Sequence, residues 1–119
     1  MSNIDFRTEI RTPTNVFVNV IVSDEEHYLS RATNISSRGM HVVKLPEHRD
    51  EVRFVWLLFW LPNSDELIRA LGEVVHSRGT QHLDYVGFKF KYVSPKHRRV
   101  LDHYLGARGE FQVNISVAA

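Results

Sequence analysis

The chain has 119 residues, a formal net charge of +1 and no cysteine, with 43% apolar and 24% charged residues. This size and composition predict one globular domain with its own core, and the absence of cysteine excludes disulfides and thiolate metal sites. The near-neutral charge argues against extended nucleic-acid binding, and the longest apolar run, residues 54–61, is too short to insert across a membrane.

The first 13 residues are polar and end in Thr12-Pro13, so we expect a flexible N-terminal arm over residues 1–13. Because the arm contains no apolar run typical of a secretion signal, a cytoplasmic location is expected. The folded unit is expected over residues 14–106, followed by a tail over residues 107–119. Apolar residues alternate in the tail, which favours a short extra strand or pairing with a neighbouring chain.

Six segments have the alternating pattern of strands: residues 15–22, 27–34, 40–44, 51–61, 67–77 and 83–93. Their spacing, with polar turns between them, favours a small antiparallel barrel. A helix is predicted next, because Ser94-Pro95 supplies an N-cap and a first-turn proline and Gly106 supplies a stop. The basic residues Lys96, Arg98 and Arg99 of this helix are expected to form a solvent-exposed face.

The segment 51–61 is apolar on both faces, whereas a barrel wall has only one inner face. Its outer face therefore needs cover from the helix, the tail or a second copy of the chain, so a homodimer is one possibility. The side chains of Trp56 and Trp60 are expected in the barrel core or in such an interface.

Two short polar signatures carry the chemistry. Arg7 and Arg11 are four residues apart, so in an extended segment they point the same way, about 13 Å apart along the chain. Asn34-x-Ser36-x-x-Gly39 follows, with an amide that both donates and accepts, a hydroxyl, and a glycine expected to permit a positive φ at a turn. The guanidinium group suits phosphates and the O6/N7 edge of guanine, and the chain has eleven Arg against four Lys.

Arg-x-x-x-Arg followed by Asn-x-Ser-x-x-Gly resembles the signature of the PilZ family, and residues 85–90 are similar to the family's last-strand Val-Gly-x-x-Phe pattern. This resemblance implies a mainly β fold, a six-stranded antiparallel PilZ-type β-barrel with a C-terminal α-helix. It also implies a ligand, the bacterial second messenger cyclic di-GMP. It assigns ligand-binding roles to both signatures: Arg7 and Arg11 on guanine and phosphate, Asn34 and Ser36 on the second guanine edge, and Gly39 in the shape of the loop.

Two further positions are weaker candidates within the same resemblance. Arg38, at a variable position of the second signature, is a candidate for an extra phosphate contact. Phe6 stands where many family members carry a basic residue, a departure that is expected to change the affinity or the number of ligands bound. Its ring can still stack on a base.

Each signature also has a simpler interpretation. Arg7 and Arg11 can be solvated residues of a terminus, and residues 34–39 can be a plain hairpin turn, since Asn, Ser and Gly favour turns. The turn interpretation is compatible with ligand binding. The seven histidines lack metal-site spacing, and no nucleophile with a base and an orienting group can be assembled, so we expect no metal, no cofactor and no enzymatic activity.

The sequence therefore predicts a cyclic di-GMP receptor whose arm changes conformation on binding and which signals through an unidentified protein partner in motility, pili or exopolysaccharide control. The alternative is a PilZ-fold adaptor of a motility complex that does not bind the nucleotide. A small barrel that binds single-stranded nucleic acid is a third option, which the near-neutral charge disfavours.

Overall fold

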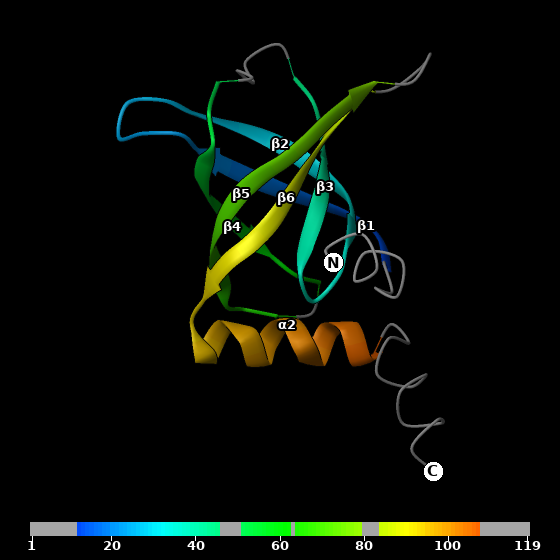
Figure 1. Cartoon of the computed structure of the whole chain (residues 1–119). Helices are drawn as coiled ribbons and strands as arrows, with labels where there is room; N and C mark the ends of the chain where they lie inside the picture. Colours follow the sequence, from blue (N-terminus) through cyan, green and yellow to red (C-terminus); the bar gives the residue numbers. More distant parts are fainter. Residues whose placement is uncertain (1–11, 46–50, 63, 80–83, 108–119) are drawn as a thin grey trace.

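The computed structural model describes residues 12–45, 51–62, 64–79 and 84–107. These residues contain six strands and one helix (Figure 1): β1 (Thr12–Ile21), β2 (His27–Ile35), β3 (Gly39–Val43), β4 (Phe54–Trp60), β5 (Leu67–Gly79), β6 (Asp84–Val93) and α2 (Pro95–Ala107). Each segment expected to be a strand contains one. The first strand starts at Thr12, earlier than the predicted residue 15, so the barrel takes up the end of the expected arm.

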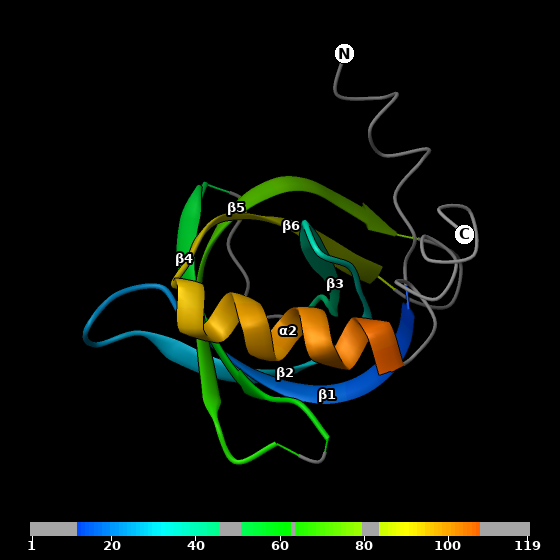
Figure 2. The same ribbon diagram turned by 90° about the horizontal axis from the view of Figure 1, so that it is seen from below.

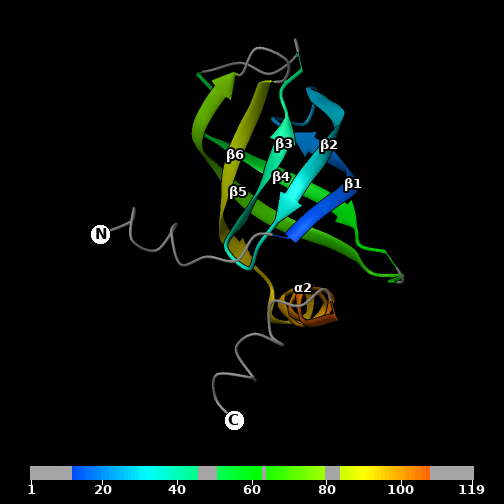
Figure 3. The same ribbon diagram turned by 90° about the vertical axis from the view of Figure 1, so that its right-hand side faces the viewer.

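The strands close into a barrel in the order β1-β2-β3-β6-β5-β4, and every neighbouring pair is antiparallel. The predicted six-stranded antiparallel barrel with a C-terminal helix is thus confirmed. The order is not a simple succession, because β3 pairs with β6, while β4 pairs with β5 and β1. The chain therefore passes to the opposite side of the barrel between β3 and β4. This places the start of β3 directly beside β6 (Figure 3).

The barrel interior is filled by side chains at every second position of the strands. In β1 the valines at positions 16, 18 and 20 point inward, as their alternation predicted, and Val18 and Val20 are fully buried. Leu57 and Phe59 of β4 meet them inside the barrel. Burying a side chain of this size contributes about 1.5–3 kcal/mol relative to leaving it exposed, so the interior dominates the stability of the fold.

Helix α2 closes one end of the barrel, as the view along the barrel in Figure 2 shows. It starts where the sequence predicted, and the Ser94 hydroxyl accepts a hydrogen bond of 3.2 Å from the backbone N–H of His97. Leu101 and Leu105 are fully buried and belong to the same core cluster as the barrel interior. These two side chains hold α2 rigidly on the barrel.

The outer face of β4 carries the two tryptophans, which were expected in the core or in an interface. Trp56 and Trp60 point outward, so they are not core residues. Trp60 is 58% exposed, and Trp56 is half-buried beneath Arg69, whose guanidinium carbon lies 4.0 Å from a ring centroid of the indole. The inner face belongs to Val55, Leu57 and Phe59, and the buried leucines of α2 join that core.

Candidate functional site

The Asn-x-Ser-x-x-Gly signature forms the hairpin between β2 and β3. It includes the last two residues of β2, a turn at residues 36–38 and the first residue of β3. The Ser36 hydroxyl accepts a hydrogen bond of 3.1 Å from the backbone N–H of Arg38, and the Ser36 N–H donates to the Gly39 carbonyl at 2.9 Å. Ser36 is fully buried. Serine thus shapes the turn through a side-chain-to-backbone bond typical of such loops.

Gly39 is required by a close approach to β6. A Cβ atom at this position would overlap the carbonyl oxygen of Phe88 and would lie 3.1 Å from its carbonyl carbon. The φ of Gly39 lies outside the left-handed region, so the expected positive φ is wrong. The physical reason is the β3–β6 pairing, in which Gly39 is opposite Lys89 and no space is left for a side chain.

Asn34 lies on the outer face of the barrel in a row that crosses three strands. Its Nδ2 is 3.1 Å from Nδ1 of His41, the residue opposite it on β3. The His41 ring in turn contacts the ring of Tyr85 on β6, with centroids 4.8 Å apart. Asn34 follows an irregularity in the β2–β3 register after Ala32, which turns its amide to this face. The amide is therefore supported from the side by an imidazole and an aromatic ring.

The side chain of Arg38 is exposed while its backbone is held firmly. Its N–H donates to Ser36, and its carbonyl accepts a hydrogen bond of 2.7 Å from the N–H of Phe90. The turn therefore presents a guanidinium group from a fixed backbone. A positive charge at the tip of this hairpin is suited to an anionic group.

A residue far along the chain also contacts this turn. Nη1 of Arg98, on α2, donates a hydrogen bond of 2.5 Å to the carbonyl oxygen of Ser37. The expectation that Arg98 belongs to a solvent-exposed face of the helix is therefore wrong. The two residues are 61 positions apart, and no local pattern signals their contact, because it depends on α2 crossing the end of the barrel that carries the turn (Figures 2 and 3).

A family model described as PilZ domain matches residues 5–107. The chain belongs to the PilZ family. No curated protein matches this PilZ chain in sequence. Among solved structures, it is similar to the Bacillus subtilis inhibitor of motility MotI/DgrA, with a TM-score of 0.72 at 18% identity, over 91% of this chain and 52% of that one.

Two structures of YcgR from Escherichia coli with c-di-GMP also match this PilZ fold. The YcgR complex has a TM-score of 0.70 at 17% identity, covering 94% of this chain and 50% of YcgR. The PilZ domain of YcgR has a TM-score of 0.63 at 14% identity, covering 95% and 98%. At these identities the likeness concerns the fold, and this PilZ chain spans about half the length of MotI/DgrA and of YcgR.

The structure places the second PilZ signature and leaves the first untested. Asn34, Ser36, Arg38 and Gly39 lie together at one hairpin, by the contacts given above. The remaining predicted ligand-binding residues, namely Phe6, Arg7 and Arg11, lie outside the described residues, as does the tail from residue 108 onward. Their roles stay predictions.

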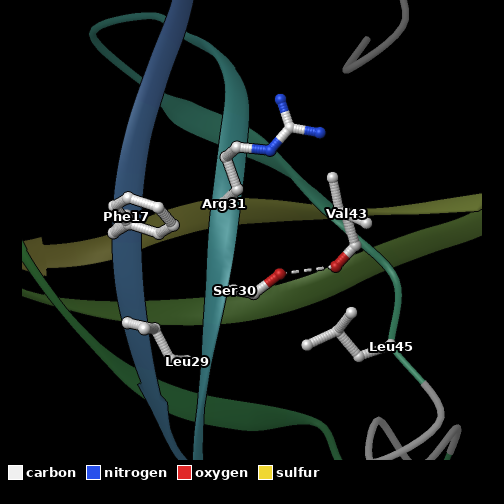
Figure 4. Close-up of a pocket in the computed structure, with 6 residues that line it drawn as sticks. All are labelled: Phe17, Leu29, Ser30, Arg31, Val43 and Leu45. Atoms are coloured by element: carbon white, nitrogen blue, oxygen red, sulfur yellow. Dashed lines mark hydrogen bonds between the residues drawn. The ribbon is translucent and has the colours of Figure 1, made fainter.

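A separate hollow of about 220 Å³ lies further along β1, β2 and β3 (Figure 4). Its lining is mainly apolar: Phe17, Leu29, Ser30, Arg31, Val43 and Leu45. Phe17 and Leu29 are 65% and 61% exposed, so this is an open surface depression rather than an enclosed cavity. It contains no residue of the PilZ signatures and is not the candidate site.

Among the described residues, no three or more His, Asp or Glu side chains gather in a way that could hold a metal ion. No helix there is both long enough and apolar enough to cross a membrane.

Proposed function

We propose that this PilZ protein is a non-enzymatic receptor for cyclic di-GMP. The observation that carries the proposal is the hairpin at residues 34–39, whose turn is held by hydrogen bonds within the protein and which carries both the Asn34 amide and the exposed side chain of Arg38. Because bonds within the protein hold this turn, binding a ligand there should cost little for ordering it. The PilZ family membership and the c-di-GMP named with the YcgR structures support the choice of ligand.

Each residue of the hairpin has a chemical part in this proposal. The Asn34 amide pairs with a guanine edge, because it offers a donor and an acceptor together. Arg38 meets a phosphodiester charge from the turn. Ser36 acts through the shape of the turn, since its buried hydroxyl already accepts the Arg38 N–H. Arg7 and Arg11 are proposed to meet guanine and phosphate from the N-terminal side, with Phe6 beside them.

Signalling is proposed to pass through protein contact. In this proposal the segment that carries Arg7 and Arg11 closes on the ligand against the β2–β3 hairpin and presents a new surface to a protein partner. Control of motility, pili or exopolysaccharide production is the process we propose. A cytoplasmic location would give the receptor access to the nucleotide.

Isothermal titration calorimetry with cyclic di-GMP tests the site directly. Asn34→Ala removes hydrogen bonds to the guanine edge, worth about 1–3 kcal/mol, and should weaken binding by about 5- to 150-fold. Asn19→Ala is the matched control, because Asn19 lies toward the other end of β1, where it pairs with Leu29 and Leu58 and not with the hairpin. Equal affinities of the two variants would overturn the assignment of Asn34.

A test of Arg11 in the first signature needs a control variant that removes the same positive charge elsewhere on the protein. Arg11→Ala should abolish most of the binding, since it removes a charge-assisted contact, whereas Arg53→Ala removes the same charge from an exposed residue that pairs with Glu73. Comparable losses in both variants would mean that only bulk charge matters. The Arg11 assignment would then fail.

The alternative function is an adaptor that does not bind the nucleotide. The observation that favours it is the apolar outer wall of the barrel, where Phe17, Leu29, Phe54, Trp60 and Tyr92 are all exposed. Such a surface suits contact with another protein or with a second copy of the chain. A thermal-shift assay distinguishes the two functions. If the folded protein binds cyclic di-GMP, ligand at 100 times Kd adds about 2.7 kcal/mol and raises Tm by about 10 °C, and an adaptor shows no shift.

A further inference from the structure

Three consecutive carbonyl groups of the β2–β3 turn are each held by a hydrogen bond. The Gly39 carbonyl accepts from the Ser36 N–H within the turn, and the Arg38 carbonyl accepts from the N–H of Phe90 on β6. The Ser37 carbonyl accepts from the guanidinium of Arg98 on α2. The turn is thus held by one bond within the turn, one from β6 in the barrel wall and one from the C-terminal helix α2.

Two partners orient the guanidinium group of Arg98. Its Nη1 also lies 3.8 Å from Oδ1 of Asp102, one helical turn further along, so the guanidinium has an acidic partner on the helix as well as the turn carbonyl. The side chain is 36% exposed, which leaves it partly shielded from water. A hydrogen bond from a charged donor is stronger than one between neutral groups.

Helix α2, which carries Arg98, is packed against the barrel. Leu101 and Leu105 are buried in the end of the barrel, and the Tyr104 hydroxyl lies 3.0 Å from Oγ1 of Thr14 on β1. Because α2 is fixed to the barrel in this way, a bond from Arg98 sets the position of Ser37 relative to the whole domain. The Ser37 carbonyl depends on this bond.

We propose that Arg98 is a positioning residue for the ligand-binding turn: it fixes the loop between Asn34 and Gly39 in the shape that receives the nucleotide. The proposal rests on the proposed function for the identity of the ligand. Arg98 acts through the turn and makes no contact with the ligand. Its removal therefore loosens the turn in the ligand-free protein and weakens binding as a consequence.

The test compares Arg98→Ala with Arg99→Ala, which removes the same charge from the next, exposed position of α2. Hydrogen exchange is followed by NMR at the backbone amides of Ser36 and Arg38 in the ligand-free protein, with circular dichroism to verify the fold. We expect about tenfold faster exchange in Arg98→Ala and a change below about twofold in Arg99→Ala. Arg98→Lys keeps a charged donor of similar length and should restore most of the protection, also if the alanine variant folds poorly.

Calorimetry with cyclic di-GMP on the same variants completes the test. The affinity should fall by about 5- to 30-fold in Arg98→Ala and by less than about threefold in Arg99→Ala. Equal exchange at the turn in the two alanine variants overturns the proposal. So does weaker binding by Arg98→Ala with unchanged exchange, because Arg98 would then contact the ligand directly. If the wild-type protein binds no cyclic di-GMP, the proposed function fails, while the exchange measurement still decides whether Arg98 holds the turn.

Discussion

Replacing Gly39 by alanine tests whether the close approach of β3 to β6 shapes the site. The added Cβ would overlap the backbone carbonyl oxygen of Phe88, which cannot rotate away as a side chain can. Relief requires the two strands to move apart, at a cost of about 1–3 kcal/mol for overpacking. The hydrogen bond from the Phe90 N–H to the Arg38 carbonyl lies beside the clash, and its loss adds about 1 kcal/mol. The expected loss of stability is therefore about 2–4 kcal/mol.

This loss converts into a measurable change of melting temperature. An unfolding entropy of about 2.1 cal/mol/K per residue over 119 residues gives about 0.25 kcal/mol for each degree, so Tm should fall by about 8–16 °C. Urea unfolding followed by circular dichroism measures the free energy, and a thermal scan measures Tm.

Gly72→Ala is the matched control for this prediction. A Cβ at Gly72 would lie 2.8 Å from Cδ1 of Leu57, the tip of a flexible side chain that can rotate. We expect a loss below about 1.5 kcal/mol there. If Gly39→Ala were as stable as Gly72→Ala, moving the two strands apart would cost no more than rotating one side chain. The argument that Gly39 is needed for the β3–β6 contact would then be refuted.

Three other substitutions test separate contacts. Ser36→Ala leaves the Arg38 N–H without its acceptor and should cost about 1–3 kcal/mol in urea unfolding, with faster amide exchange at Arg38; unchanged exchange would contradict the role of the hydroxyl. Leu101→Ala empties a fully buried position beneath α2 and should cost about 2–5 kcal/mol, and a cost below 1 kcal/mol would mean that α2 is not part of the core. Arg69→Ala uncovers the Trp56 ring and should shift its fluorescence to longer wavelength with a stability loss of about 1 kcal/mol at most, whereas an unchanged spectrum would argue against the cation–π contact.

The strands and the helix were predictable because their signals are local. Valine at every second position of β1 follows from the two-residue period of a strand, and burial at positions 16, 18 and 20 confirms it. Ser94 and Pro95 marked the start of α2 by the chemistry of a helix N-terminus alone. The PilZ signature in turn indicated both the family and the closed barrel.

The arrangement of these elements was harder to predict. Both faces of β4 are apolar, so alternation alone could not tell that Leu57 and Phe59 point inward while Trp56 and Trp60 point outward. The pairing of β3 with β6 follows from closure of the barrel, and the reason for Gly39 follows from that pairing. The Arg98–Ser37 contact adds one more step, because it also requires α2 to cross the correct end of the barrel.

The shape of the candidate site is consequently set by parts of the chain that are far from its signature. A free hairpin with the same Asn-x-Ser-x-x-Gly residues would keep the Ser36 bonds inside the turn, but it would lose the bonds from Phe90 and Arg98. Two of the three turn carbonyls would then be free to rotate toward water, so the loop after Asn34 would no longer have a fixed shape. In the proposed function, the barrel and α2 act as the scaffold that shapes this common turn sequence for binding, so substitutions beneath α2 should weaken the binding of cyclic di-GMP as well as the fold.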